Sequence, residues 1–218
     1  MADVLVPSNV HVPIIVTACA EEIERRGLTE EGIYRITGSL SSVNYLKEQF
    51  NRDLDTAVKH VADYDVNVLS SILKSFFREL PEPLIKWEEF IAFFNALEIE
   101  DDDERISMLN HTLVSLPKPR RDTFQYLLCH LVRVSEYESS NKMSLNNLAM
   151  IWAMTLFQPA PEVPEGEDAT LLFQLENCIP LLVHASMSQP VFGPAIHIVI
   201  ISGSIVLLEP LQFVKLLL

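Results

Sequence analysis

Cysteine is scarce in this chain of 218 residues. The three cysteines, Cys19, Cys129 and Cys178, lie far apart in apolar surroundings. Because neither their odd number nor their spacing suits a disulfide framework or a metal site, we expect buried, reduced thiols in a cytosolic protein. The N-terminus also lacks a basic region followed by an apolar block, so the sequence predicts no signal peptide.

Basic residues are also few relative to acidic ones. The chain has 16 Lys and Arg against 30 Asp and Glu, a formal net charge of −14, and a sequence pI of about 4.8. This balance disfavours nucleic acid as a partner, because phosphate backbones are bound by clustered Lys and Arg. A local basic patch for a protein partner remains compatible with it. With 49% hydrophobic and 21% charged residues, the composition is typical of one folded domain of ordinary size with room for an appendage.

Catalytic and metal-binding motifs are missing too. The sequence contains no Gly-x-Ser-x-Gly motif and no phosphate loop, which disfavours an independent hydrolase. The acidic run at 98–104 lacks the glycine and spacing of a calcium loop, so we interpret it as a solvated linker. The histidines are scattered without ligand spacing: His11, His60, His111, His130, His184 and His197. We therefore predict no metal site and no cofactor of the chain's own.

Helical periodicity of apolar residues is the dominant pattern that the chain does have. It predicts helices over 13–26, 43–50, 65–80, Trp87–Leu97, 106–117, 121–137, 144–156 and 169–186. We expect Gly27 to end the first helix in a left-handed conformation and Ser41 or Ser42 to cap the second. Ser144 is the expected cap of the helix that runs to Leu156. Since nothing in this part of the chain alternates like a strand, the sequence predicts an all-α domain.

The predicted helix over 65–80 has the broadest apolar face. That face consists of Leu69, Ile72, Leu73, Phe76, Phe77 and Leu80. Lys74 and Arg78 lie four residues apart and share one edge of the helix, where such a pair usually forms a solvated polar face. Pro81 and Pro83 are expected to stop the helix.

Between the first two predicted helices lies a short loop, Glu31–Ser39, with Arg35 at its centre. We expect Gly32 and Gly38 to let the chain turn sharply around Arg35. Ile33 and Ile36 are expected to pack inward and leave the guanidinium free to project. Such an arginine is a candidate for insertion into a partner's active site, where it would stabilise charge on a transferring phosphoryl group. The simpler alternative is an ordinary exposed arginine in a turn.

The last 31 residues differ in character from the rest of the chain, and this apolar tail has no clearly predicted structure. Residues 191–218 are almost wholly apolar, 196–201 resemble a strand, and the uninterrupted run before Glu209 is shorter than the about 20 residues of a membrane span. The tail could be a weak membrane-associated segment, an edge packed on the domain, or a divergent splice terminus without a role in the fold. We favour the third. The expected organisation is an N-terminal extension at 1–9, one domain at 10–187 and the tail at 188–218.

Three separated stretches carry a family resemblance. They are GIYR at 32–35 with Gly38, LKSFFRELPEPL at 73–84, and NKMS at 141–144 leading to NLA at 147–149. With these motifs in this order on an all-α pattern, the chain resembles the GTPase-activating domain of Rho-family small GTPases, the RhoGAP domain, over roughly residues 10–187.

The resemblance implies roles for individual residues. Arg35 matches the arginine finger of the family. Lys74 and Arg78 match a pair that supports the finger loop and contacts the switch regions of the GTPase. Asn147 and Thr155 match partner-binding positions of the last motif. The sequence departs from the family at Thr155, where asparagine is usual, at Met154, where proline is usual, and at Asn67, where histidine is expected.

The implied function is stimulation of GTP hydrolysis by a Rho/Rac-type GTPase in its GTP-bound state. The chain would complete the partner's active site instead of being an independent enzyme, and the partner would hold GTP and Mg²⁺. The alternative is a non-catalytic module of the same fold that docks a small GTPase or another signalling protein. We expect a cytoplasmic protein with recruitment to membranes where the GTPase resides, and membrane contact only indirectly or through the tail.

Overall fold

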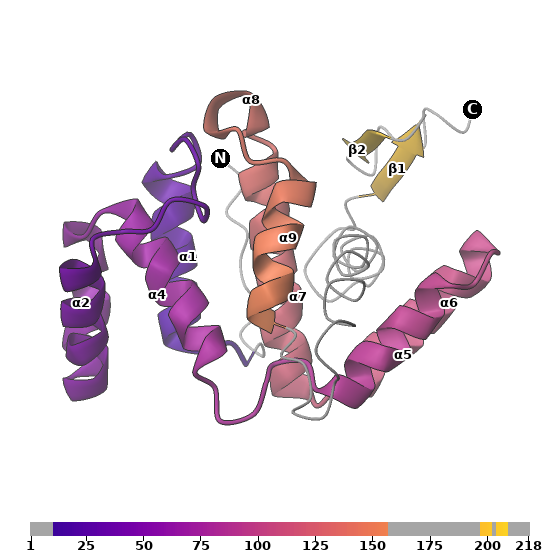
Figure 1. Ribbon diagram of the computed structural model, residues 1–218, viewed down its shortest axis with the longest axis horizontal. Helices are drawn as coiled ribbons and strands as arrows, with labels where there is room; N and C mark the ends of the chain where they lie inside the picture. Colours follow the sequence, from indigo (N-terminus) through magenta and orange to yellow (C-terminus); the bar gives the residue numbers. More distant parts are fainter. Residues whose placement is uncertain (1–10, 157–196, 202–203, 209–218) are drawn as a thin grey trace, which may run out of the picture.

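The computed structural model describes residues 11–156, 197–201 and 204–208, and every regular element between residues 11 and 156 is helical (Figure 1). The prediction of an all-α domain is therefore confirmed. The elements are α1 (Ile14–Arg26), α2 (Leu40–Arg52), α3 (Leu54–Lys59), the 3₁₀ turn η1 (Val61–Asp63), α4 (Val66–Arg78), α5 (Trp87–Leu97), α6 (Asp102–Ser115), α7 (Lys118–Ser135), α8 (Glu138–Asn141) and α9 (Leu145–Leu156).

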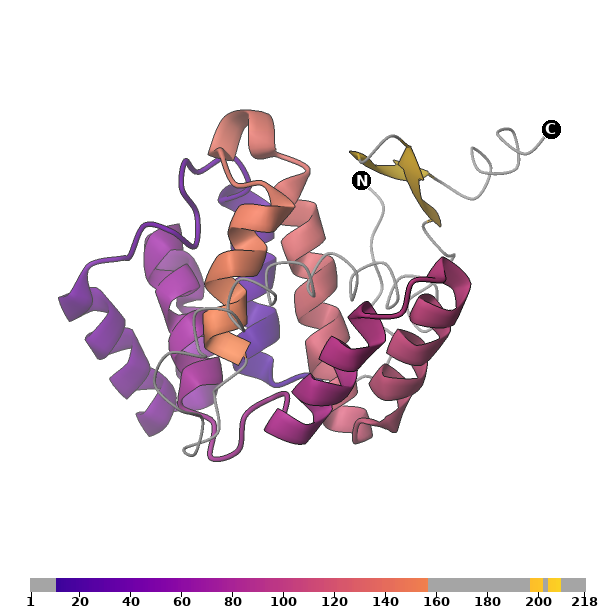
Figure 2. The ribbon, with the colours of Figure 1, turned by 45° about the vertical axis from the view of Figure 1, so that its right-hand side comes forward.

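Four helices form the centre of the domain. Helix α1 packs on α4 and α7, and α9 packs on the same two helices. Helices α2 and α3 pack together, with α2 against α4, whereas α5 and α6 pair on the other side of the molecule (Figures 1 and 2). The loop between α1 and α2 lies at the end of the central bundle where α8 is also found (Figure 1).

Helix α4 buries the apolar face that its sequence predicts. Leu69, Ile72, Leu73 and Phe77 are almost completely buried, whereas Phe76 is half-buried. The Asp65 side chain begins the helix by accepting a hydrogen bond from the backbone N–H of Asn67 at 2.8 Å. The helix ends at Arg78, ahead of the two prolines.

The starts of α6 and α7 differ from the sequence prediction. The acidic run at 98–104 is a linker only over residues 98–101, because α6 begins within the run at Asp102. The Asp101 side chain caps this helix by accepting a hydrogen bond from Glu104 N at 2.9 Å, and acidic residues in a first turn are favoured by the helix dipole. Helix α7 begins three residues early, at Lys118, because proline is tolerated in a first turn.

The predicted caps have mixed outcomes. Helix α2 begins at Leu40 after Ser39, so capping by Ser41 or Ser42 is wrong. Gly27 does end α1, but its φ of −112° and ψ of 0° are not left-handed. A Cβ there would lie 3.0 Å from Val66 Cγ1, so close packing favours glycine. The Ser144 cap is confirmed, since its Oγ accepts a hydrogen bond from Asn147 N at 3.1 Å.

The strand-like pattern in the tail is confirmed for the backbone. Strands β1 (His197–Ile201) and β2 (Ser204–Leu208) pair antiparallel, with His197 opposite Leu208 and Ile201 opposite Ser204. The helix predicted over 169–186 lies outside the described residues. None of the described helices is long and apolar enough to cross a membrane.

Candidate functional site

Arg35 lies on a tight, hydrogen-bonded turn between α1 and α2. The backbone N–H groups of Arg35 and Ile36 both donate to the carbonyl oxygen of Gly32 at 2.8 Å. Gly32 has a φ of +71°, in the left-handed region that favours glycine. A Cβ at Gly32 would also lie 2.9 Å from the side chain of Ile36. The predicted sharp turn at Gly32 is therefore present.

Gly38 has a different role from the one its position suggested. Its φ is not in the left-handed region, so it is not a second turn residue. A Cβ at Gly38 would lie 2.5 Å from the backbone N and Cα of Val68, and its own N–H donates to Ser71 Oγ at 3.1 Å. Gly38 thus lets the loop backbone pack directly against α4.

The buried anchors of the loop are Ile33 and Tyr34. Both side chains are fully buried, whereas Ile36 is 50% exposed, so the prediction that Ile36 packs inward is wrong. Tyr34 has a φ of 70°, which turns its ring into the core. There the ring packs edge-on against Trp152, with centroids 5.3 Å apart, and against His130.

The Arg35 side chain, in contrast, is exposed. Its guanidinium forms no hydrogen bond or ion pair with any of the residues that the structure describes. The turn therefore fixes the backbone on both sides of Arg35 and leaves its charged group available to another molecule.

Lys74 is buried and contacts this loop from α4. It is 7% exposed, and its Nζ donates a hydrogen bond to the carbonyl oxygen of Tyr34. Burial lowers the pKa of Lys74, and the nearby charge of Arg78 lowers it further. The interpretation of Lys74 as part of a solvated polar face is wrong, because its ammonium holds the carbonyl that precedes Arg35.

Arg78, one helical turn further on, is exposed. Its Nη2 donates a hydrogen bond to Thr155 Oγ1 at 3.4 Å, across the α4–α9 contact. Thr155 itself is only 1% exposed and its hydroxyl donates to Ile151 O at 3.2 Å, whereas its neighbour Met154 is 61% exposed. Thr155 therefore supports Arg78, and Met154 occupies the surface beside it.

Comparison with known proteins places this chain in a family. The family model of the RhoGAP domain matches residues 13–161. The chain belongs to the RhoGAP domain family. Its sequence is 41% identical to the active breakpoint cluster region-related protein of Xenopus tropicalis over 155 residues, covering 71% of this chain and 18% of that protein. It is 42% identical to the human breakpoint cluster region protein over 149 residues, covering 68% and 12%.

Further relatives agree with this assignment. The chain is 39% identical to rat N-chimaerin over 152 residues, covering 69% of this chain and 45% of that protein. It thus spans less than half the length of each of these curated relatives. The crystal structure of human Rho GTPase activating protein 15 has a TM-score of 0.71 and 32% identity, covering 87% of this chain and 88% of that one. The BH domain from GRAF, the GTPase regulator associated with focal adhesion kinase, has a TM-score of 0.67 and 26% identity, covering 79% and 90%.

The RhoGAP domain also uses a buried residue that the sequence analysis missed as part of the site. The carbonyl oxygen of Asn141 accepts a hydrogen bond from Gly32 N at 2.8 Å. The Asn141 side chain donates to Leu28 O and Val134 O and accepts from Met143 N, each at 2.8 Å. Asn141 thereby ties the loop that carries Arg35 to the end of α8, and its place at the start of the NKMS motif was the available signal.

Asn147 completes the predicted set of site residues, and Asn67 is a position where the sequence departs from the family. Asn147 is exposed in the first turn of α9, where its side chain donates to Lys142 O at 3.4 Å. Asn67, at the position where histidine is expected, is 8% exposed and donates to Glu30 Oε1 at 3.2 Å. Asn67 therefore adds another tie between α4 and the segment that leads to Arg35, whereas Asn147 remains at the surface.

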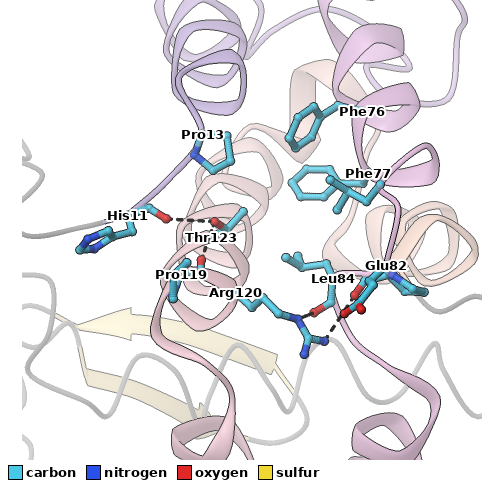
Figure 3. Close-up of a pocket in the computed structure, with 11 residues that line it drawn as sticks. His11, Pro13, Phe76, Phe77, Glu82, Leu84, Pro119, Arg120 and Thr123 are labelled. Carbon is cyan, nitrogen blue, oxygen red and sulfur yellow. Dashed lines mark hydrogen bonds between the residues drawn. The ribbon is translucent and has the colours of Figure 1, made fainter.

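A separate pocket lies near the C-terminal end of α4 (Figure 3). It has a volume of about 270 Å³, and its lining is mostly apolar, including Phe76, Phe77 and Leu84. On one side of it, Arg120 Nε donates to Leu84 O at 2.8 Å, and Thr123 Oγ1 donates to Pro119 O at 2.8 Å. None of the predicted site residues lines this pocket, so the RhoGAP domain presents Arg35 on a surface outside it.

Proposed function

We propose that this RhoGAP domain stimulates GTP hydrolysis by a Rho-family small GTPase, with Arg35 supplied in trans as an arginine finger. The observation that carries the proposal is an exposed guanidinium, without a partner among the described residues, on a backbone fixed by Gly32 and Lys74. The name of the related Rho GTPase activating protein 15 supports the same activity.

The chemistry follows from the properties of arginine. Hydrolysis of GTP develops negative charge on the γ-phosphate oxygens, and a planar, permanently charged guanidinium can donate to two oxygens at once. A backbone that is already fixed loses little freedom when the side chain enters the partner's active site. In this mechanism no residue of the chain is a nucleophile or base, because water attacks and the GTPase holds the nucleotide, the magnesium and the glutamine that orients water.

Apolar side chains beside Arg35 suit a protein partner. Ile36 and Leu40 follow Arg35 in the same segment and are 50% and 73% exposed. Contact with the GTPase would cover them and remove water from around the guanidinium, which strengthens its interaction with phosphate. We propose that this occurs with the GTP-bound partner, in the cytoplasm and at the membranes where the GTPase resides.

A docking module without catalytic activity is the second candidate. The observation that favours it is the pair Met154 and Thr155, where the family usually has proline and asparagine. Threonine lacks the second donor–acceptor group of an amide, and here the buried hydroxyl donates to Ile151 O of its own helix and accepts from Arg78. One partner contact of an active RhoGAP domain would then be absent.

Single-turnover hydrolysis separates the two candidates. GTP-loaded Rho, Rac and Ras-type proteins would be measured with and without the full chain, next to direct binding of each loaded GTPase. Stimulation of a Rho or Rac protein supports the activator, whereas binding without stimulation supports the docking module. Absence of both would refute both candidates.

A further inference from the structure

A chain of hydrogen bonds leads from the finger loop into the core between α1 and α7. Tyr34 Oη lies 2.5 Å from His130 Nε2, and His130 Nδ1 lies 2.6 Å from Glu24 Oε1. Arg133 Nη2 lies 2.7 Å from the same Glu24 oxygen. Tyr34 and His130 are fully buried, whereas Glu24 and Arg133 are partly exposed, so this series of hydrogen bonds connects the core to the surface.

The environment sets the direction of each hydrogen bond. Burial raises the pKa of Tyr34 well above its usual value and lowers the pKa of His130, an effect that Glu24 only partly opposes. At neutral pH the phenol is therefore protonated and the imidazole is neutral. Since the Glu24 carboxylate can only accept, His130 Nδ1–H donates to it and Nε2 accepts from the Tyr34 hydroxyl.

Tyr34 is consequently held at three points. Its hydroxyl donates to His130, its ring packs on Trp152, and its carbonyl accepts from Lys74. Its φ of 70° is uncommon for a residue with a side chain, and such a conformation persists where surrounding contacts enforce it. The next residue is Arg35, so the orientation of the Tyr34 backbone decides where the Arg35 side chain leaves the loop.

We infer that His130 is a positioning residue for Arg35, which acts by holding the Tyr34 hydroxyl in the core and thereby fixing the backbone of the finger loop. This inference deepens the proposed function and rests on it. The alternative is that the hydrogen-bond chain stabilises the fold without affecting the finger. A positioning role predicts that loss of the Tyr34 hydroxyl lowers the hydrolysis rate at saturating protein, whereas a purely structural role predicts that this rate stays unchanged.

Tyr34→Phe is the most conservative test, because it keeps the ring on Trp152 and removes only the hydroxyl. We expect it to lower the single-turnover rate at saturating RhoGAP domain by roughly 10- to 100-fold, since small displacements of a catalytic group have effects of that size. Phe93→Leu, in the core of α5, is the control for general loss of stability. We expect the control to leave the saturated rate unchanged, and an unchanged rate in Tyr34→Phe would overturn the inference.

A double-mutant cycle with Arg35→Ala tests the route of the effect. If the Tyr34 hydroxyl acts through Arg35, Tyr34→Phe should cause no further loss of rate in the Arg35→Ala background. An equal fold-loss in both backgrounds would overturn the inference, because it would show an effect that does not involve the finger.

Variants of His130 give a second route if Tyr34→Phe folds poorly. His130→Gln keeps a hydrogen-bond acceptor for the Tyr34 hydroxyl, whereas His130→Leu does not. We expect the saturated rate of His130→Gln to lie closer to that of the wild type. Equal rates in two folded variants would contradict a positioning role.

Failure of the proposed function can be told apart from failure of this inference. If the wild type stimulates no GTPase, the proposed function fails, and amide hydrogen exchange of Arg35 and Ile36 then tests the loop alone. Tyr34→Phe should speed their exchange more than Phe93→Leu does at matched global stability. Unchanged exchange would overturn the inference.

Discussion

Lys74 on α4 donates a hydrogen bond from its buried ammonium to the carbonyl oxygen of Tyr34, the residue before Arg35. The two residues are 40 positions apart in the sequence, and their contact joins α4, which buries its apolar face in the core, to the loop that carries the exposed arginine. A cation in this place orients the loop backbone without occupying the surface that a partner would contact. Lys74 is therefore part of the loop's support, and Arg78 lies at the surface.

Lys74→Met keeps most of the buried stem and removes the charge and the donor. We expect it to lower stability by about 1–3 kcal/mol, because the Tyr34 carbonyl loses its buried partner. Binding of the GTP-loaded partner and the stimulated rate should both fall, since the loop loses a tie beside Arg35. Chemical denaturation, binding and single-turnover hydrolysis measure these effects.

Lys47→Met is the matched control for that variant. Lys47 pairs with Glu79 on the exposed surface of α2 and α4, where such pairs contribute up to about 1 kcal/mol. A Lys74→Met protein indistinguishable from the Lys47→Met protein in stability and activity would disprove the role of Lys74 in the loop.

The sequence predicts the parts of this fold that depend on regular burial. Helix α5 has the predicted bounds, and α4 buries the predicted stripe, because packing a helix on a core requires apolar residues at regular spacing. Helices α3 and α8 were missed because six and four residues are too few to show that spacing. The start of α6 was missed because its acidic first turn resembles a solvated loop.

The candidate site was only partly predictable for a different reason. The positions of Arg35, Lys74 and Arg78 follow from motifs, but the burial of Lys74 depends on a carbonyl 40 residues away. Tyr34 rather than Ile36 is buried because the backbone of Tyr34 is left-handed, and tyrosine gives no sequence signal for that conformation. Contacts between distant segments therefore decide which of these side chains are buried, because the local sequence pattern does not determine it.

Asn141 offers a test of the support that α8 gives to the loop. Asn141→Ala removes three side-chain hydrogen bonds from a fully buried site, so we expect a loss of about 3 kcal/mol or more in the free energy of unfolding. Asn147→Ala changes an exposed asparagine in the same region and should alter stability by no more than about 0.5 kcal/mol.

The two asparagines should also differ in partner binding. Asn147→Ala is expected to weaken binding of the GTP-loaded partner while its unfolding curve stays like that of the wild type. Denaturant unfolding and equilibrium binding give both quantities. A large stability loss in Asn147→Ala, or none in Asn141→Ala, would contradict these assignments.

His130 should make stability depend on pH below neutrality. In the unfolded chain a histidine titrates at about pH 6.5, whereas burial lowers the pKa of His130 in the folded domain. As pH falls below about 6.5 the unfolded chain takes up a proton that the folded chain does not. Stability from this group is thus full above that pH and declines by up to about 1.4 kcal/mol per pH unit below it.

His130→Gln removes this contribution and keeps the neighbouring Glu24, Arg133 and Tyr34. Between pH 6.5 and 5.5 we expect the wild type to lose stability more steeply than the variant, as measured by urea unfolding at fixed ionic strength. Identical slopes would show that His130 does not titrate differently on folding.

The tail is expected to be dispensable for the fold. Residues 11–156 already form a continuous core in which Trp152 and Leu156 are buried. A chain shortened to end at Ser188 should therefore unfold cooperatively and show helical circular dichroism. If the shortened chain is insoluble or molten while the full chain is well folded, the tail belongs to the core.

Arg35 gives the sharpest prediction. If it is the finger, its contribution lies mainly in the transition state, so Arg35→Ala should lower the stimulated rate far more than it lowers binding. We expect a loss of about 10³-fold or more, with little change in stability because the side chain is exposed. Arg35→Lys should restore little of the rate, since an ammonium keeps the charge but lacks the planar fork that reaches two oxygens.

Arg52→Ala is the control, because Arg52 is also an exposed arginine and lies at the other end of α2. It should bind and stimulate like the wild type. The measurements are single-turnover hydrolysis at saturating RhoGAP domain and binding of the same GTP-loaded GTPase. If the Arg35→Ala protein stimulates hydrolysis as well as the Arg52→Ala protein does, the assignment of Arg35 as the finger is refuted. No other described residue of this loop carries a positive charge that could replace the guanidinium at the phosphate.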